Sequence, residues 1–289
     1  MRNELLHKIM NPYKNVVERI IPGAVPLEVY LWHIGRYIFA LKFISSDDLV
    51  LDIACGTGYG SYLLAKKGAK KVIGVDISKD AVNYAKTRYK SNNLKFLVGD
   101  ATNMPINSSE IDVLVSFETI EHLKNPDEFL MECKRVLKDS GTLVLSTPNK
   151  YASLKKHVEN PYHVNELFIE EIIDKITSLG FEIIGIYGQR PINSLSDDIN
   201  IKNVNKHFIT VITKLMPRFI KKRIYAYHYL PGKTGIPRKM IKIYESNPEK
   251  FEEWFIHNEI DHRYLPLPIL DIESGKSKFD VFVIVAKKR

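Results

Sequence analysis

Short apolar runs alternate with longer segments of mixed character along the first two thirds of the chain. Six such runs, each followed by polar residues, lie at 49–53, 71–76, 94–98, 111–117, 142–147 and 181–187. The segments between them repeat apolar positions every three or four residues, which is typical of amphipathic helices. This alternation of strands and helices along the chain predicts an α/β fold, with a doubly wound, mostly parallel sheet covered by helices on both faces. Ligands of such sheets bind beyond the carboxyl ends of the strands.

This alternation stops at Arg190 and returns only with a short β-branched run at 279–286. A helix is also expected ahead of the first strand, at 27–44, where apolar residues follow one helical face. The pattern predicts three parts: an N-terminal helical segment (1–45), a ligand-binding α/β domain (46–189 plus 279–289), and a mainly helical insertion between the last two strands (190–278).

Composition and charge narrow the classes of protein that fit. The chain is 45% hydrophobic and 26% charged, as expected of a folded globular protein. Its net charge of +8 comes entirely from residues 189–289, because acidic and basic residues balance over 1–188. Between Ile199 and Tyr244 there are eleven lysines and arginines and no acid. The insertion is therefore expected to lie near something anionic.

The expected setting is the cytoplasm. Cys55 and Cys133 fit no metal-ligand spacing, and we expect both to stay reduced. Charged residues interrupt 1–20, so this stretch lacks the apolar centre of a secretory signal, and no later stretch is apolar enough to span a bilayer. Peripheral contact of the basic insertion with an anionic membrane is kept as an option.

The segment 49–60 carries the strongest chemical signal. It is an apolar run that contains Asp52 and continues into glycines at Gly56, Gly58 and Gly60. We interpret it as a buried strand, a tight turn and the start of a helix. Glycine permits positive φ and leaves no Cβ between the turn and a ligand, so the turn predicts a nucleotide-sized pocket.

Several motifs together resemble those of class I S-adenosylmethionine-dependent methyltransferases, over 18–188 and again over 279–286. The run Asp52-Ile53-Ala54-Cys55-Gly56-Thr57-Gly58 is similar to the acidic, glycine-rich loop of that family, with Ala54 in place of the first glycine. The resemblance implies a seven-stranded sheet whose last strand is antiparallel, and S-adenosylmethionine as cofactor. The cofactor-binding residues that it implies, with Arg36 as a partner for the cofactor carboxylate, are Arg36, Asp52, Ala54, Gly56, Gly58, Asp76, Ile77, Asp100, Ala101 and Phe117.

Further segments resemble the branch that methylates small molecules, quinones, sugars and lipids, and they include Glu121-His122-Leu123 and Asn160-Pro161-Tyr162-His163-Val164. Methyl transfer to a hydroxyl requires loss of a proton. His122 is the first candidate for the general base and His163 the second, because neutral imidazole accepts a proton near pH 7. Glu121 is a candidate to orient either histidine. Each histidine has the alternative of a structural role in a loop, and no metal is expected.

Two alternatives compete with this interpretation. Dinucleotide-binding domains also place an acid after their second strand, so NAD is an alternative cofactor. The dinucleotide-binding loop prefers Gly or Ala at the position of Ser61 and needs no acid at the position of Asp52, so the sequence fits NAD less well. The other alternative is an inactive, cofactor-binding partner subunit, which the intact Asp52 and Asp76 argue against.

The insertion is expected to form a lid over the methyl acceptor, and three interpretations of its basic residues remain open. They are solvated lysines on a packed lid, a site for a phosphorylated sugar, glycan or lipid-linked acceptor near a membrane, and an RNA-binding surface. A helix kinked at Pro217 is expected within it. RNA binding would use the aromatic residues beside the lysines, namely Tyr225, Tyr227, His228 and Tyr229. The acceptor and the oligomeric state stay open.

Overall fold

One sheet of eight strands organises most of the described chain. The computed structural model describes residues 19–156, 160–190, 238–258, 264–269, 272–276 and 278–289. The chain divides into two units, one of 1–191 with 264–289 and the other of 192–263. The sheet belongs to the first unit, and its strands are β1 (Leu49–Ile53), β2 (Lys71–Asp76), β3 (Leu94–Val98), β4 (Ile111–Phe117), β5 (Leu137–Pro148), β6 (Phe181–Gln189), β7 (Leu267–Pro268) and β8 (Val281–Lys288).

The strand order is β3-β2-β1-β4-β5-β8-β6-β7. Strands β3, β2, β1, β4 and β5 are parallel to one another, whereas β8 is antiparallel to both β5 and β6. The strand order reverses at β1, where β2 pairs on one side and β4 on the other. This topology confirms the predicted doubly wound, mostly parallel sheet with an antiparallel last strand.

The sheet has one strand more than the seven expected. The additional strand, β7, is two residues long and pairs antiparallel with Tyr187 and Gly188 of β6. It comes from the region assigned to the helical insertion. Pro268 lies in it, and proline is tolerated at a sheet edge because no neighbour needs its missing N–H. So short a strand beside prolines leaves no alternation that the sequence pattern could show.

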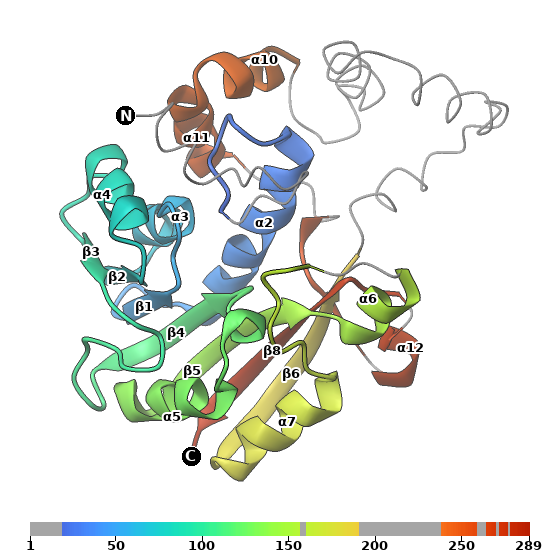
Figure 1. Ribbon diagram of the computed structural model, residues 1–289. Helices are drawn as coiled ribbons and strands as arrows, with labels where there is room; N and C mark the ends of the chain where they lie inside the picture. The colour runs from blue at the N-terminus through green and yellow to red at the C-terminus, as the bar shows by residue number, and fades with distance from the viewer. Residues whose placement is uncertain (1–18, 157–159, 191–237, 259–263, 270–271, 277) are drawn as a thin grey trace, which may run out of the picture. The chain divides into compact units, whose positions relative to one another are not determined.

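Helices cover both faces of the sheet (Figure 1). Helices α2, α3 and α4 lie on one face and α5 and α7 on the other. The helices of this unit are α2 (Leu27–Ala40), α3 (Tyr59–Lys67), α4 (Lys79–Arg88), α5 (Pro126–Val136), α6 (Lys150–Lys156), α7 (Ile169–Ser178) and α12 (Ile272–Lys276), with 3-10 turns η1 (Leu41–Phe43) and η2 (Ile120–His122). The helix expected at 27–44 is therefore α2 followed by η1. No helix in the described part of the chain is long and apolar enough to cross a bilayer.

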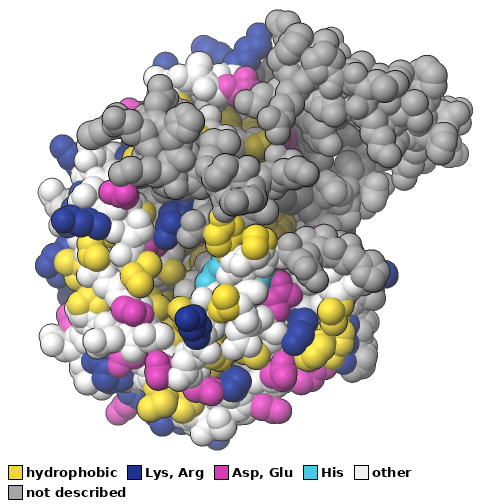
Figure 2. Space-filling view, viewed as in Figure 1, with side chains coloured by type: hydrophobic (Ala, Val, Ile, Leu, Met, Phe, Trp, Pro, Cys, Tyr) yellow, Lys and Arg dark blue, Asp and Glu magenta, His cyan; other side chains and the backbone are white. Residues whose placement is uncertain are grey.

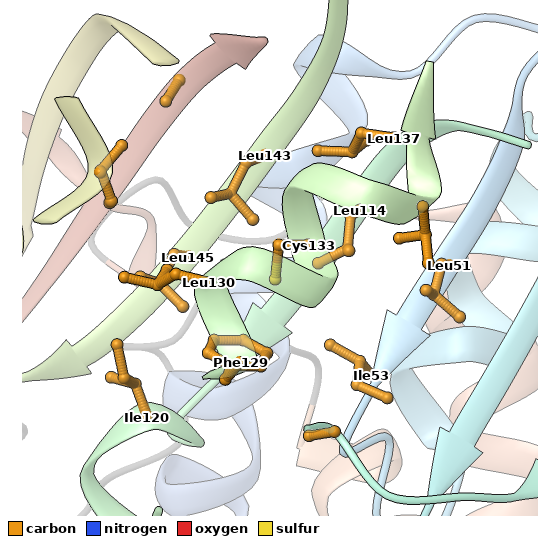
Figure 3. Packing of buried hydrophobic residues seen from close by; sticks show 14 of the residues in the cluster. Leu51, Ile53, Leu114, Ile120, Phe129, Leu130, Cys133, Leu137, Leu143 and Leu145 are labelled. Atoms are coloured by element: carbon orange, nitrogen blue, oxygen red, sulfur yellow. The ribbon is translucent and has the colours of Figure 1, made fainter. Parts of the chain in front are cut away.

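The core between the sheet and α5 fixes the strand ends. Phe129, Leu130 and Cys133 of α5 face leucines of β4 and β5, among them Leu114 and Leu145, and all five are fully buried (Figure 3). Burial of a side chain of this size contributes about 1.5–3 kcal/mol. The central strands therefore form a rigid base for the loops that leave their carboxyl ends.

The second unit is described only over α10 (Arg238–Ser246) and α11 (Pro248–His257). These helices pack together through Tyr244 and Phe251, whose ring centroids lie 5.1 Å apart. The expected helix with its kink at Pro217, the aromatic run at 225–229 and most of the basic cluster lie outside the described residues. The same holds for residues 1–18 of the N-terminal segment.

Candidate active site

The carboxyl ends of β1, β2 and β4 meet at one edge of the sheet, and a cavity of about 440 Å³ lies there. Its wall includes the turn after β1, the end of β2, and the residues that follow β4. Eight of the predicted site residues line this cavity: Arg36, Ala54, Gly56, Asp76, Ile77, Ala101, Phe117 and His122. The other five, Asp52, Gly58, Asp100, Glu121 and His163, are not among its lining residues.

The turn after β1 places its glycines in two different environments. Ala54, Gly56 and Gly58 all have positive φ, at 60°, 56° and 86°. A Cβ added to Gly56 would meet nothing within 4 Å, so this backbone is open to the cavity. A Cβ added to Gly58 would lie 2.7 Å from the Cβ of Ala85 and 2.8 Å from the ring of Phe96. Gly58 is therefore required by packing and backbone conformation.

Asp76 ends β2 beside this turn. Its Oδ2 accepts a hydrogen bond from the Gly56 amide at 2.8 Å, and its Oδ1 accepts one from the Ser78 amide at 2.8 Å. The guanidinium of Arg19 lies 3.6 Å from Oδ1. Each carboxylate oxygen has about two lone-pair sites, so the pair can accept further hydrogen bonds from a ligand that enters the cavity.

Asp52 lies behind the turn. It is fully buried, and it accepts hydrogen bonds from the Ser61 hydroxyl at 2.5 Å and the Tyr37 hydroxyl at 3.3 Å. Burial raises the pKa of Asp52 to about 7, although both hydrogen bonds act to lower it. This carboxyl joins α2, which carries Tyr37, to α3, which carries Ser61.

Two apolar residues near the ends of β2 and β3, Ile77 and Ala101, also line the cavity. Of these, Ile77 has 66% of its surface exposed. Asp100 itself is exposed, and its Oδ1 accepts hydrogen bonds from the backbone amide and the hydroxyl of Thr102, both at 2.8 Å. Phe117 is buried at the end of β4. An exposed apolar side chain at a cavity is suited to the face of a planar ring.

Arg36 lies on α2 and is almost fully buried. Its two terminal nitrogens donate hydrogen bonds to the Gln189 side chain at 2.8 Å and to Nδ1 of His33 at 2.7 Å, while Nε has no partner. Arginine only donates, so Nδ1 of His33 must accept, which places the ring proton on Nε2. Burial and the charge of Arg36 lower the pKa of His33 well below its usual value. The cavity wall thus holds a buried cation with a spare N–H and a neutral histidine.

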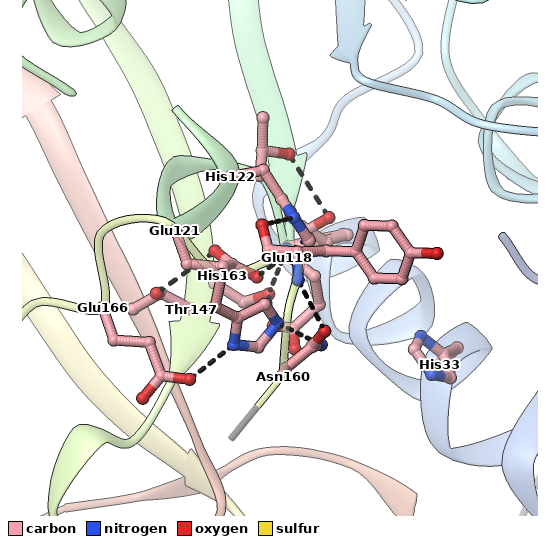
Figure 4. Close-up of polar contacts among 12 residues, drawn as sticks. His33, Glu118, Glu121, His122, Thr147, Asn160, His163 and Glu166 are labelled. Atoms are coloured by element: carbon pink, nitrogen blue, oxygen red, sulfur yellow. Dashed lines mark hydrogen bonds and ion pairs between the residues drawn. The ribbon is translucent and has the colours of Figure 1, made fainter. Parts of the chain in front are cut away.

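His122, which lines the cavity, contacts the ring of a second histidine, His163 (Figure 4). His122 belongs to η2 and His163 to the segment before α7, and their rings are nearly perpendicular with centroids 5.0 Å apart. His122 Nδ1 lies 2.9 Å from the Tyr162 carbonyl oxygen, which can only accept. Nδ1 therefore carries the proton, and Nε2 of neutral His122 carries the lone pair.

His163 is held by neighbours on its own segment. Its Nδ1 makes a short hydrogen bond to Glu166 Oε1, and the Asn160 amide nitrogen lies 2.8 Å from its Nε2. Because the amide donates to Nε2, Nδ1 donates its proton to Glu166. The carboxylate that contacts His163 is thus Glu166, which was absent from the sequence prediction.

Glu121 is fully buried beside His122. Its Oε2 accepts a hydrogen bond from the Thr147 hydroxyl at 3.3 Å, whereas Oε1 has no hydrogen-bond partner and lies 3.8 Å from His122 Nε2. Burial, and after it the charge of Glu118, raise the pKa of Glu121 well above its usual value. Glu118 lines the cavity and accepts a hydrogen bond from the Ser146 hydroxyl at 2.8 Å.

Sequence reasoning missed ten of the lining residues. Some of them could have been predicted from the sequence. Cys55 and Thr57 lie inside the glycine-rich motif, and Glu118 directly follows the fourth predicted strand. Others had none, because only the fold brings distant segments to the cavity. The missed residues are Arg19, Ile20, His33, Cys55, Thr57, Tyr59, Glu118, Thr119, Leu123 and Tyr162.

The described surface shows no region of a single charge sign on the face drawn in Figure 2. Basic and acidic side chains are interspersed there, and histidine atoms are visible near the centre of the face with acidic side chains beside them. Eight of the eleven lysines and arginines between Ile199 and Tyr244 lie outside the residues that the structure describes.

Comparison with known proteins adds three findings on sequence. A family model described as a methyltransferase domain matches residues 44–191, half of the chain. The chain is 35% identical over 169 residues to a Mycolicibacterium smegmatis protein named a probable S-adenosylmethionine-dependent methyltransferase, which covers 57% of this chain and 64% of that protein. It is 29% identical over 184 residues to the ubiquinone biosynthesis O-methyltransferase of Glaesserella parasuis, covering 56% and 77%. The chain thus spans less than two thirds of the length of the mycobacterial relative.

Solved structures share the fold. A SAM-dependent methyltransferase from Archaeoglobus fulgidus has a TM-score of 0.50 at 21% identity, covering 90% of this chain and 94% of that one. The [4+2]-cyclase SpnF has a TM-score of 0.52 at 16% identity, covering 93% and 86%. Identities this low establish the fold alone, and the cyclase is named for a different reaction.

Proposed function

Because this chain belongs to the methyltransferase domain family, we propose that it transfers the methyl group of S-adenosylmethionine to a hydroxyl oxygen of a small acceptor. The observation that carries the proposal is one cavity that joins an open glycine turn and a strand-end carboxylate to a histidine with an oriented lone pair. The proposed acceptor is a sugar, glycan or lipid-like molecule, phosphorylated or not. The similarity to a ubiquinone O-methyltransferase supports oxygen as the methylated atom.

The proposed cofactor site follows the cavity wall. Asp76 accepts hydrogen bonds from the ribose hydroxyls, and the amino-acid portion of the cofactor lies against the open backbone at Gly56. The adenine ring packs on Ile77 beside Ala101. The unpartnered Nε of Arg36 supports the assignment of this residue to the cofactor carboxylate, because a buried N–H without an acceptor is costly. Asp52, Gly58 and Asp100 are proposed to support the cofactor indirectly, through the turn, α3 and the loop after β3.

The proposed chemistry is an in-line displacement. The acceptor oxygen forms a bond to the methyl carbon, the electron pair of the breaking C–S bond stays on sulfur, and the hydroxyl proton leaves. His122 is the proposed base, because its proton is held at Nδ1 by the Tyr162 carbonyl and its Nε2 therefore bears the lone pair. Glu121 and His163 are proposed to complete the catalytic cluster.

The first experiment uses methyl-labelled S-adenosylmethionine, the purified protein and a cell extract from its own source. Label is counted in separated lipid, saccharide, RNA and protein fractions. Label in an ether of a lipid or saccharide supports the proposal. Label in RNA would replace it with the alternative in which the basic insertion binds RNA, and this binding would weaken steeply with salt. Bound cofactor with no labelled product would point to an inactive partner subunit.

A variant tests the histidine. His122→Asn is expected to lose most turnover while keeping its affinity for the cofactor, because His122 is not one of the proposed cofactor contacts. His257→Asn, at an exposed position of α11, is the matched control. Wild-type turnover of His122→Asn at every pH tested would refute a role for this residue in proton removal.

The proposed setting is the cytoplasm. Both cysteines of the chain are buried and free, which is compatible with a reducing compartment. Contact of the basic insertion with an anionic membrane remains part of the proposal for a lipid-linked acceptor.

A further inference from the structure

Three acceptor groups converge beside the cavity. One candidate ligand atom from each of Glu121, His122 and His163 lies within 4.8 Å of the others. Ligands bound to a divalent cation at about 2.0–2.2 Å lie roughly 3–4 Å apart, depending on the angle between them. The 3.8 Å from His122 Nε2 to Glu121 Oε1 falls in that range.

Both imidazole rings are oriented as metal ligands are. A histidine that binds a metal through one nitrogen usually donates its other N–H to a carboxylate or a backbone carbonyl. His122 donates from Nδ1 to the Tyr162 carbonyl, and His163 donates from Nδ1 to the carboxylate of Glu166. Each ring therefore has its lone pair on Nε2. The Asn160 amide, which donates to Nε2 of His163, is the group that a cation would displace.

Glu121 supplies an independent reason to expect a positive ligand. Its Oε1 is fully buried and has no hydrogen-bond partner, yet it faces the lone pair of His122 Nε2. Two acceptors that face each other repel unless a proton or a cation lies between them. Glu118, which lines the cavity, adds negative charge to the same region, and the charge of Arg36 opposes it with a smaller effect on Glu121. Burying the Glu121 carboxylate with one oxygen unpartnered is costly in free energy.

We propose that Glu121, His122 and His163 hold one divalent transition-metal cation at the edge of the cavity. Two imidazoles and one carboxylate suit Zn²⁺, Mn²⁺, Fe²⁺, Co²⁺ or Ni²⁺ better than Mg²⁺ or Ca²⁺, which prefer sites made of oxygen alone. The ligands come from η2 and from the segment before α7, which is why no spacing in the sequence indicates this site.

The catalytic role of the cation rests on the proposed function, and the cation changes one step of that function, the removal of the hydroxyl proton. The acceptor hydroxyl binds the cation, and its proton leaves to water because a bound cation lowers the pKa of an attached hydroxyl. The oxygen then forms its bond to the methyl carbon, and the C–S electron pair stays on sulfur. His122 and His163 act in this step as ligands, and Glu166 as a positioning residue that holds His163.

Cobalt titration of the untagged, metal-depleted protein tests the site without cofactor or acceptor. Bound Co²⁺ is followed by its visible absorption, and one saturable equivalent is expected. Glu166→Gln should weaken binding by about 10–100-fold, which is typical when the hydrogen-bond partner of a ligating histidine is lost. Glu121→Gln and His163→Asn should weaken it further. His257→Asn, which removes an exposed histidine of α11, should leave it unchanged.

The outcomes separate this inference from the proposed function. Unchanged cofactor affinity in each variant shows that the variant is folded, so a loss of Co²⁺ binding then supports the site. Absence of saturable binding, or equal binding by wild type and Glu121→Gln, overturns it and leaves a proton on Glu121 as the positive partner. Full methylation activity of metal-depleted protein also overturns the catalytic role while sustaining the proposed function. A saturable Co²⁺ site without any methylated oxygen product sustains the site and refutes the proposed function.

Discussion

Substitution by alanine is predicted to affect the two glycines of the turn after β1 differently. Gly58→Ala should lose more stability, and Gly56→Ala should lose more affinity for the cofactor. Both glycines have positive φ, which costs an alanine about 1–2 kcal/mol. Alanine recovers roughly 0.4–1 kcal/mol, because it has less freedom than glycine in the unfolded chain. These two effects act at both positions, and the surroundings of the added Cβ decide the difference.

At Gly58 the Cβ would lie 2.7 Å from the Cβ of Ala85 and 2.8 Å from the ring of Phe96. Overpacking of a well-packed core costs about 1–3 kcal/mol, so Gly58→Ala should lose roughly 1.5–4 kcal/mol of unfolding free energy. At Gly56 the Cβ would meet nothing within 4 Å, so Gly56→Ala should lose only about 0.5–1 kcal/mol. For a domain of this size, each 1 kcal/mol lowers Tm by about 2–4 °C.

Binding should show the reverse order, because Gly56 lines the cavity and Gly58 does not. Thermal unfolding and calorimetric titration with S-adenosylmethionine, carried out on both variants and wild type, measure the two effects separately. Gly58→Ala should have the lower Tm and, at a temperature where it is folded, the smaller loss of cofactor affinity. Equal Tm values for the two variants, or a larger affinity loss in Gly58→Ala, would refute the assignment of one glycine to packing and the other to the ligand.

Three further predictions concern the same site. Ala54→Gly should raise the unfolding free energy by about 0.5–1 kcal/mol in urea titrations, because Ala54 has a φ of 60°. Burial raises the pKa of Asp52 from 3.8 to about 7, so its contribution to stability is full below pH 4 and is lost as pH rises through 7. Urea midpoints should therefore favour Asp52→Asn over wild type more strongly at pH 8 than at pH 4, and an unchanged difference would contradict the shift. Asp76→Asn should weaken cofactor binding by about 10–100-fold, since hydrogen bonds to a charged group contribute about 1.5–3 kcal/mol. Asp100→Asn, at an exposed position, should weaken it less.

Local pattern was sufficient to predict the main elements of the sheet. Apolar runs of strand length gave β1 to β4 close to their observed bounds. β1, β2 and β4 are buried at nearly every position and must be apolar there, whereas β3, at the sheet edge, is buried only at Phe96. The sequence alone also pointed to Gly56 and Asp76, which line the cavity, since a positive φ and a strand-end carboxylate are properties of short segments.

Contacts between distant segments could not be predicted in this way. Glu166 holds His163, and His33 with Gln189 holds Arg36, although nothing in the local sequence indicates these partners. Strand β7 was missed for a related reason, since a two-residue strand is defined by its neighbour and not by its own pattern.

The sequence by itself thus determined the fold class, the family and the strand ends beside which the cavity lies, because hydrophobic periodicity and short motifs act over a few residues. The tertiary structure alone decided which side chains share the cavity, which protonation states their partners impose, and that Glu121, His122 and His163 converge on one centre. The physical reason is that hydrogen-bond partners and burial depend on packing between segments that lie far apart in the chain.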